Sequence, residues 1–181
     1  KLGPIRYLVN AAGVLTPSRL LDAPIDDIRK TIDINFTSTL LLTQAIARHM
    51  VPRNTGSIVT ISSNSGTTPR TALGAYPASK AGLNHAMKCL GLELAEYGIR
   101  CNLVSPGSTD TPMQRSFQSK QSDLDGVING DLERWRLGIP LGRMADPDDV
   151  ADLVLFLLSE QARHITMENI IIDGGATLGA R

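Results

Sequence analysis

Tyr76 and Lys80 are the residues whose types and spacing best suit a chemical reaction. They are four positions apart, so they share one face if the segment is helical. An ammonium group beside a phenol favours the phenolate, lowers its pKa from about 10 and creates a general base near neutral pH. Ser63 lies thirteen residues before Tyr76, and a strand–loop–helix connection of that length can bring its hydroxyl beside the phenol. Taken alone, both features also fit a helix surface and a polar strand end.

Two short segments rich in small and polar residues could contact a ligand. Residues 10–13 read Asn-Ala-Ala-Gly, and their small side chains let a backbone or a flat ligand come close. Residues 106–111 read Pro-Gly-Ser-Thr-Asp-Thr, with exposed backbone groups and two threonine hydroxyls that could hold an amide. Each segment alone also fits an ordinary turn.

These candidate residues belong to a chain that alternates strands with helices. The pattern predicts strands over Ile5–Val9, Ile58–Ile61, Arg100–Val104 and Ile170–Ile172, and helices over Ile25–Met50, Ala75–Tyr97 and from Pro147 onward. Asp146 suits the cap of the last helix, whose apolar residues recur on one stripe. The alternation predicts an α/β fold, a parallel sheet with helices on both faces. Because ligands bind at the carboxyl ends of such strands, the candidate residues should meet there.

The segment from Thr109 to about Asp131 is polar and shows no clean period. We interpret it as a mobile region with one short helix, against which Trp135 packs. Arg115 is expected at the surface. The sequence shows no repeat, low-complexity tract or linker, so residues 1–181 are interpreted as a single domain.

Composition and charge are those of an ordinary globular chain of 181 residues. Lys plus Arg total 18 and Asp plus Glu total 18, which removes the usual reason to expect a nucleic acid or an anionic membrane surface as partner. No apolar run approaches the roughly 20 residues that span a bilayer. Cys89 and Cys101 lack CxxC spacing and the histidines lack metal-ligand spacing, so we expect a reducing compartment, the cytoplasm, and no metal.

The combination of these motifs, with Asn35 inside the first helix, strongly resembles the short-chain dehydrogenase/reductase family in order and spacing over all 181 residues. The resemblance implies a Rossmann-type, doubly wound parallel sheet. It also implies a small-molecule substrate and a nicotinamide cofactor, NAD with NADP as the alternative. A homo-oligomer, a tetramer as in the family, is expected as well.

The resemblance assigns roles to individual residues. Tyr76 exchanges the hydroxyl proton, Ser63 hydrogen-bonds the reacting oxygen, and Asn35 holds a water in a proton relay. Lys80 lowers the pKa of Tyr76 and holds the nicotinamide ribose. The cofactor-binding residues that it implies are Asn10, Ala11, Ala12, Gly13, Tyr76, Lys80, Pro106, Gly107, Thr109 and Thr111.

One part of the family pattern is not found in this sequence. Members begin with a strand, a glycine-rich TGxxxGxG turn and a helix, which together hold the cofactor pyrophosphate, and no such turn precedes Leu8. By the resemblance, the chain starts near the family's fourth strand, about 80 residues into the fold, so we expect its C-terminal portion, strands four to seven. The residue that selects NAD or NADP belongs to the earlier portion.

Several stretches narrow the resemblance to members that oxidise a carboxylated cyclohexadiene diol to a catechol in siderophore biosynthesis. They read SPGSTDTPMQR at residues 105–115, LGIPLGR at 137–143 and IDGGATLGA at 172–180. Such a substrate needs a fixed cation, and Arg70 offers a planar fork that suits a carboxylate. Met113 and Gln114 could add an apolar wall and a hydrogen bond. A solvated Arg70 and a loop that packs without substrate contact are the plainer alternatives.

Two other functions compete with this interpretation. Another short-chain reductase, such as a 3-oxoacyl-carrier-protein reductase, shares the four catalytic positions but has no need of Arg70. A truncated, catalytically silent subunit would keep the two long helices, residues 25–50 and 75–97, which pair between subunits in the family.

Overall fold

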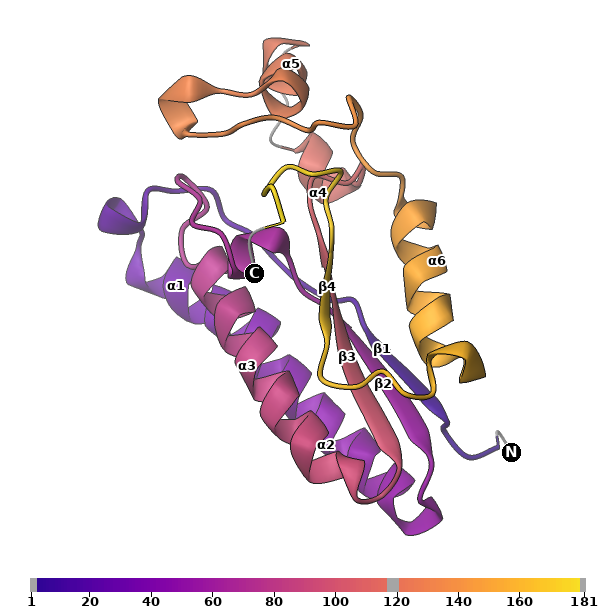
Figure 1. Cartoon of the computed structure of the whole chain (residues 1–181). Helices are drawn as coiled ribbons and strands as arrows, with labels where there is room; N and C mark the ends of the chain where they lie inside the picture. Colours follow the sequence, from indigo (N-terminus) through magenta and orange to yellow (C-terminus); the bar gives the residue numbers. More distant parts are fainter. Residues whose placement is uncertain (1–2, 117–120, 180–181) are drawn as a thin grey trace.

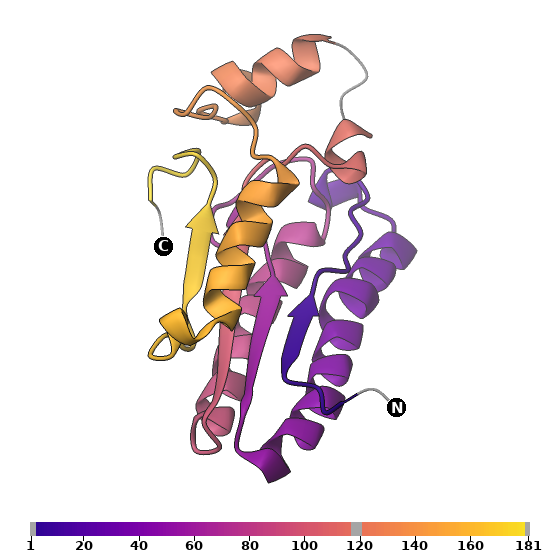
Figure 2. The same ribbon diagram turned by 90° about the vertical axis from the view of Figure 1, so that its right-hand side faces the viewer.

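The computed structural model describes residues 3–116 and 121–179. Within these residues lies a sheet of parallel strands, β1 (Tyr7–Asn10), β2 (Gly56–Ile61), β3 (Ile99–Pro106) and β4 (Asn169–Ile172), in the spatial order β1-β2-β3-β4. All the arrows point the same way in Figure 2, so the carboxyl ends form one edge of the sheet. The predicted strands are confirmed, and β3 is longer at both ends than the sequence pattern indicated.

One face of the sheet is covered by the helices α1 (Ile25–Ile32), α2 (Thr39–Met50) and α3 (Tyr76–Ala95), as Figure 1 shows. A π-helical segment, Asp33–Ser38, joins α1 to α2, so the predicted helix over residues 25–50 is continuous but not α-helical throughout. The core on this face comes from α2, α3, β2 and β3 and contains Ala47, Met50, Ile58, Leu83, Met87, Leu94, Ile99, Cys101 and Leu103. Each large side chain buried in this way contributes about 1.5–3 kcal/mol, which holds α3 firmly on the sheet.

The opposite face is covered by α6 (Pro147–Leu158) (Figure 1). Asp146 caps this helix as expected, in a capping box with Asp149. The predicted apolar stripe of α6 packs on the second core, which includes Val59. Because successive residues of a strand point to opposite faces, Ile58 belongs to the first core and Val59 to the second. Helices on both faces confirm the predicted doubly wound α/β fold.

Between β3 and α6 the chain forms two short helices, α4 (Pro112–Arg115) and α5 (Gln121–Asn129), where the sequence indicated one. Residues 117–120 of this predicted mobile region lie outside the described part. Thr111 caps α4, because its hydroxyl accepts a hydrogen bond from the Gln114 backbone N–H at 3.2 Å. A capping threonine can mark the start of a short helix even where apolar residues show no helical period. Thr111 is therefore the sequence signal that could have predicted α4.

The expectation that Trp135 packs against this region is wrong, because its side chain is 83% exposed. It follows a 3₁₀ turn and adopts a positive φ of 55°. The short 3₁₀ turns of the described residues are Leu20–Asp22, Val51–Arg53, Asn64–Gly66, Leu132–Arg134 and Glu160–Ala162.

Several large apolar side chains are exposed on the described surface. Tyr7 and Val9 lie on β1 at the edge of the sheet, and Leu41, Leu42 and Leu92 lie on α2 and α3. No helix in residues 3–116 or 121–179 has both the length and the apolar character needed to cross a bilayer.

Candidate active site

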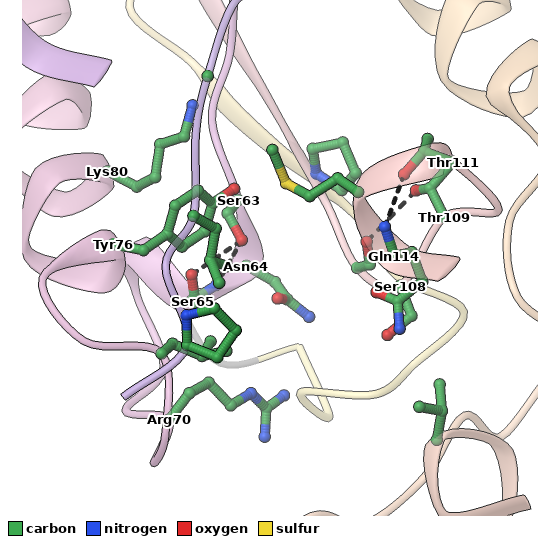
Figure 3. A pocket seen from close by; sticks show the side chains of 18 of the residues that line it. Ser63, Asn64, Ser65, Arg70, Tyr76, Lys80, Ser108, Thr109, Thr111 and Gln114 are labelled. Atoms are coloured by element: carbon green, nitrogen blue, oxygen red, sulfur yellow. Dashed lines mark hydrogen bonds between the residues drawn. The ribbon is translucent and has the colours of Figure 1, made fainter. Parts of the chain in front are cut away.

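A cavity of about 800 Å³ opens at the carboxyl edge of the sheet, beside the loops that follow β1, β2 and β3 and the first turn of α3. Figure 3 shows Tyr76 and Lys80 on one side, Thr109, Thr111 and Gln114 across from them, and Arg70 near the lower end of the view. The predicted site residues that line the cavity are Ala11, Gly13, Ser63, Arg70, Tyr76, Lys80, Pro106, Gly107, Thr109, Thr111, Met113 and Gln114. The fold therefore brings together residues that are more than a hundred positions apart in the sequence, such as Ala11 and Gln114.

Ser63 lies in the turn after β2, and its hydroxyl forms a side-chain hydrogen bond with Tyr76. Its Oγ also accepts two hydrogen bonds from Ser65, one from the backbone N–H at 3.1 Å and one from the hydroxyl at 2.9 Å. Because these bonds use the acceptor capacity of Ser63 Oγ, its own proton is directed to Tyr76 or to a substrate oxygen. Ser65 is buried and lines the cavity, and the sequence did not single it out. The sequence signal for Ser65 is its position two residues after Ser63, because a serine hydroxyl can accept a hydrogen bond from the backbone two residues later and so form a turn.

The pKa of Tyr76 is raised by burial, and the hydrogen bond with Ser63 opposes this effect. The sequence reasoning expected Lys80 to lower that pKa, but its Nζ lies 5.6 Å from the centre of the phenol ring. Desolvation of the phenolate outweighs the charge at that distance. The expected net lowering is therefore wrong for this structure.

Lys80 is held firmly at the end of β2. Its side chain is only 3% exposed, and Nζ donates a hydrogen bond to the Ile61 carbonyl at 2.9 Å. Burial lowers the pKa of Lys80 to about 8. The ammonium form still predominates near neutral pH, so a positive charge faces the cavity there.

Asn35 is fully buried in the π-helical segment and does not line the cavity. Its Oδ1 accepts a hydrogen bond from the Val14 N–H at 2.8 Å, and its Nδ2 donates to the Val14 carbonyl at 2.9 Å. Nδ2 also donates to Ser79 Oγ at 3.1 Å. Both amide protons are thus used to tie the loop after β1 to α3. The water relay implied for Asn35 stays a prediction.

Asn10 and Ala12 are the two implied cofactor residues that do not line the cavity. Asn10 is buried, and its Nδ2 donates to Thr43 Oγ1 at 2.9 Å and to Thr60 Oγ1 at 3.0 Å. It therefore joins β1 to α2 and β2 below the cavity, while Ala12 is exposed. Ala11 and Gly13 are the members of this segment that reach the cavity.

Arg70 lies half-buried in the cavity wall, and burial lowers the pKa of its guanidinium while Asp173 raises it by less. Within residues 3–116 and 121–179, no carboxylate lies at salt-bridge distance from Arg70. Met113 and Gln114 line the same cavity from α4, as expected. Arg115 is exposed and pairs with Asp110 at 2.7 Å, which agrees with its predicted surface position.

Arg136 is a second half-buried arginine in the cavity wall, and the sequence reasoning missed it. Burial lowers the pKa of its guanidinium, and the charges of Arg70 and Arg134 lower it further. It lies just after a 3₁₀ turn in a stretch without helical or strand period. No motif marks this position, and only the fold brings it to Arg70.

Known proteins resemble this chain in both sequence and fold. A family described as enoyl-(acyl carrier protein) reductase matches residues 1–177. The 2,3-dihydro-2,3-dihydroxybenzoate dehydrogenase of Bacillus subtilis is 49% identical over 179 residues, which cover 99% of this chain and 69% of that protein. The enzyme of that name from Escherichia coli is 43% identical and covers 96% and 70%. A solved short-chain type dehydrogenase/reductase from Mycobacterium marinum has a TM-score of 0.84 and 33% identity, over 96% of this chain and 65% of that one.

This chain belongs to the short-chain dehydrogenase/reductase family. It spans about two thirds of the length of these relatives. The resemblance seen in its motifs is confirmed, and membership in the family implies an oxidoreductase with a nicotinamide cofactor.

The cavity of this short-chain dehydrogenase/reductase fits a nicotinamide and its ribose. Lys80 Nζ has three N–H protons and uses one on Ile61, which leaves two for ribose hydroxyls. A Cβ atom built at Gly107 would lie 2.6 Å from Asp173 Cβ, so only glycine allows the loop after β3 to run so close to the end of β4. Gly13 lies beside Lys80, where a Cβ atom would be in ordinary van der Waals contact with Nζ, at 3.6 Å.

Proposed function

We propose that the protein oxidises 2,3-dihydro-2,3-dihydroxybenzoate to 2,3-dihydroxybenzoate, the catechol acid used for siderophores. Relatives at 49% and 43% identity carry this activity in their names, which supports the proposal. The second support comes from the cavity, where Tyr76 and a half-buried Arg70 line one space. A base and a cation in one cavity suit a ring alcohol that also bears a carboxylate.

Tyr76 acts as the general base in this proposal. Its Oη takes the proton of the ring hydroxyl while the C–H bond on the same carbon breaks and its electron pair leaves as hydride. Bound nicotinamide supplies the acceptor for that hydride. Ser63 donates its hydroxyl proton to the reacting oxygen and so orients the alcohol. The resulting ketone tautomerises to the catechol, and aromatisation makes the oxidation effectively one-way.

Lys80 supplies the positive charge that the base needs. Because its pKa is about 8, the ammonium form is present near neutral pH, and its charge favours the Tyr76 phenolate against the opposing effect of burial. Its remaining N–H protons hold the ribose hydroxyls of the cofactor. The backbone around Pro106 and Gly107 and the segment with Thr109 and Thr111 hold the nicotinamide side of the cavity.

Arg70 carries the choice of substrate. A half-buried guanidinium without a carboxylate partner loses hydration without a compensating ion pair, and an anionic ligand restores that interaction. Among the described residues Arg70 has no salt bridge, and it faces the cavity that holds Tyr76. A 3-oxoacyl thioester would leave this charge without a partner.

The test is turnover by the full-length protein with each of two substrates. One assay supplies 2,3-dihydro-2,3-dihydroxybenzoate with NAD or NADP, and the other supplies a 3-oxoacyl thioester with the reduced cofactors. We expect oxidation of the diol acid, with 2,3-dihydroxybenzoate identified by mass. Turnover of the thioester alone would favour the general reductase, and no turnover of either substrate would favour a silent subunit.

The remaining features of the proposal concern the cofactor and the setting. We name NAD, with NADP as the alternative, because the reaction is an oxidation. The exposed Leu41, Leu42 and Leu92 on α2 and α3 support a homotetramer. The free Cys89 and Cys101 support the cytoplasm as its compartment. A small molecule is the proposed partner, and neither a nucleic acid nor a membrane is needed for the reaction.

A further inference from the structure

A second, much smaller cavity of about 20 Å³ lies against the wall of the active-site cavity. Five residues line both spaces, namely Asn64, Arg70, Ser108, Val127 and Arg136. The far side of the small cavity is closed by Leu137, Gly138, Ile139 and Ala176. A space of this size admits about one water-sized group. It is too small for a ring but large enough for one oxygen of a carboxylate.

The shared wall is rich in hydrogen-bond donors. It carries the guanidinium groups of Arg70 and Arg136, the amide of Asn64 and the hydroxyl of Ser108. Arg136 Nη2 lies 3.4 Å from Ser108 Oγ, so these two side chains already point toward each other. Asn64 Nδ2 donates one proton to Asp173 at 3.2 Å and keeps the other. A donor-rich wall of this kind is complementary to an anion.

The nearest carboxylates are used by other groups. Asp131 pairs with Arg134 at 3.5 Å. Asp173 accepts hydrogen bonds from the Thr177 hydroxyl at 2.7 Å and from Asn64. Neither carboxylate forms a salt bridge with Arg70 or Arg136 within the described part of the chain. Two half-buried cations thus line one small space, neither has a salt-bridge partner among the described residues, and the charge of Arg70 lowers the pKa of Arg136. An anion bound there would interact with both of them.

The backbone on both sides of Arg136 is fixed in place. Its N–H donates to the Asp131 carbonyl and its carbonyl accepts from the Asp131 N–H, each at 2.9 Å. Just beyond it, Gly138 has a φ of 86°, and a Cβ atom there would lie 2.5 Å from the Ile128 carbonyl oxygen. The Ile139 N–H donates to that same carbonyl at 2.8 Å. The guanidinium of Arg136 is therefore presented by a well-connected turn.

We infer that Arg136 is a second carboxylate-binding residue and that the small cavity between it and Arg70 receives one oxygen of the substrate carboxylate. This inference rests on the proposed function and extends it to the group that selects the acid. Asn64 and Ser108 contribute neutral donors to the same oxygen. The ring stays in the larger cavity, where Val127 lies at the junction of the two spaces.

Binding of the product acid tests the inference without relying on turnover. Calorimetry would compare 2,3-dihydroxybenzoate with catechol in the full-length protein saturated with NAD. Loss of a hydrogen bond to a charged group lowers the affinity about 10-fold or more. Arg136→Ala should therefore weaken the binding of 2,3-dihydroxybenzoate at least about 10-fold. Binding of catechol should change less than about twofold, since catechol offers no carboxylate. Arg136→Lys should recover part of the loss.

Arg163→Ala is the matched control, because it removes an exposed arginine outside the cavity lining. The affinities for 2,3-dihydroxybenzoate and for catechol should be unchanged in this variant. Arg136→Gln keeps a long polar side chain but removes the charge. If the Ala and Gln variants both unfold cooperatively and both lose affinity for the acid, the loss is due to the missing charge. Equal weakening of both ligands, or no weakening of the acid, would overturn the inference.

The double variant Arg70→Ala/Arg136→Ala sharpens the result. If both guanidinium groups hold one carboxylate, the losses should be non-additive, whereas independent sites give additive losses. Additive losses would contradict a shared oxygen site. Failure of the proposed function would give a different result from failure of this inference. A wild-type protein that binds the acid selectively through Arg136 but does not oxidise the dihydrodiol retains the anion site and lacks the activity.

Discussion

The inner and outer walls of the active site are built in different ways. The inner wall consists of Ser63, Ser65, Tyr76 and Lys80, which lie at the end of β2 and the start of α3 over the main core. The outer wall consists of Met113, Gln114 and Arg136, which lie on the short elements between β3 and α6. Figure 1 shows α5 and the neighbouring turn standing above the sheet, away from the helices that cover it.

This difference separates two tasks. Ser63, Ser65 and Lys80 are buried and hydrogen-bonded to one another or to a strand carbonyl, and Tyr76 is half-buried beside them, so their geometry depends on the core. The outer residues depend on local caps and turns, and such segments can vary without loss of the fold. We propose that the inner wall carries out the proton transfer. In the same proposal, the outer wall and Arg70 select the substrate.

The largest effect is expected from Tyr76→Phe. It removes the proposed base and should lower kcat by about 100-fold or more, the usual contribution of general base catalysis. Steady-state kinetics of the full-length enzyme measures this. Tyr97→Phe is the control, because Tyr97 follows the C-terminal end of α3, and this variant should keep normal turnover. A Tyr76→Phe enzyme with more than about a tenth of the wild-type kcat contradicts the assignment.

Arg70→Ala is expected to have the next largest effect. A charge-assisted contact contributes about 1.5–3 kcal/mol, so kcat/KM for the carboxylated diol should fall about 10- to 150-fold. Arg70→Lys should recover part of this, because lysine supplies charge but not the planar fork. The uncarboxylated cyclohexadiene diol serves as the control substrate. An equal loss with both diols would show that Arg70 supports the loop and not the substrate.

Lys80 should make stability depend on pH. Its pKa is about 8 in the folded protein and 10.5 without burial, so the unfolded chain binds more protons between these values. Stability should therefore rise with pH over that range and be lowest below it. Between pH values of about 7 and 9.5 the gain should be about 2 kcal/mol, at about 1.4 kcal/mol for each pKa unit.

Urea unfolding of the wild type and of Lys80→Met at both pH values measures this gain. The variant should lack it, because its side chain does not titrate. Lys88→Met removes an exposed lysine from the same helix and should behave as the wild type does. The same pH dependence in Lys80→Met would mean that another group is responsible.

The smallest effect is expected from Ser65→Ala. This change removes the hydroxyl that donates to Ser63 at 2.9 Å but keeps the backbone N–H bond. A net hydrogen bond contributes about 0.5–1.5 kcal/mol, so kcat should fall about 2- to 10-fold with little change in KM. Thr55→Ala, in an exposed turn, is the control. A change in KM alone would place Ser65 in substrate binding.

Much of the inner wall could be predicted from the sequence. Ser63, Tyr76 and Lys80 have fixed spacings within one strand–loop–helix unit, and such a unit has few possible geometries. The apolar stripe of α6 and the cap at Asp146 are local signals, and both are confirmed. The direction of the Tyr76 pKa shift was not predictable in this way. It depends on how much solvent the folded chain excludes from the phenol.

The outer wall could be predicted only in part. Met113 and Gln114 follow a recognisable motif, whereas Arg136 reaches the cavity through the turn that pairs Asp131 with Arg136. The side chain of Asn35 illustrates the same limit. Its position in the helix was predicted, but its hydrogen bonds to Val14 depend on a contact between residues 21 positions apart.

The separation of tasks between the two walls is tested most directly by one ratio. It is kcat/KM for 2,3-dihydro-2,3-dihydroxybenzoate divided by kcat/KM for the diol without the carboxylate, measured in the wild type, Tyr76→Phe and Arg70→Ala. Our account predicts that Tyr76→Phe lowers both kcat/KM values by the same factor and so leaves the ratio unchanged. It predicts that Arg70→Ala lowers the ratio by about 10-fold or more. A ratio that changes in Tyr76→Phe, or that stays constant in Arg70→Ala, would contradict the account.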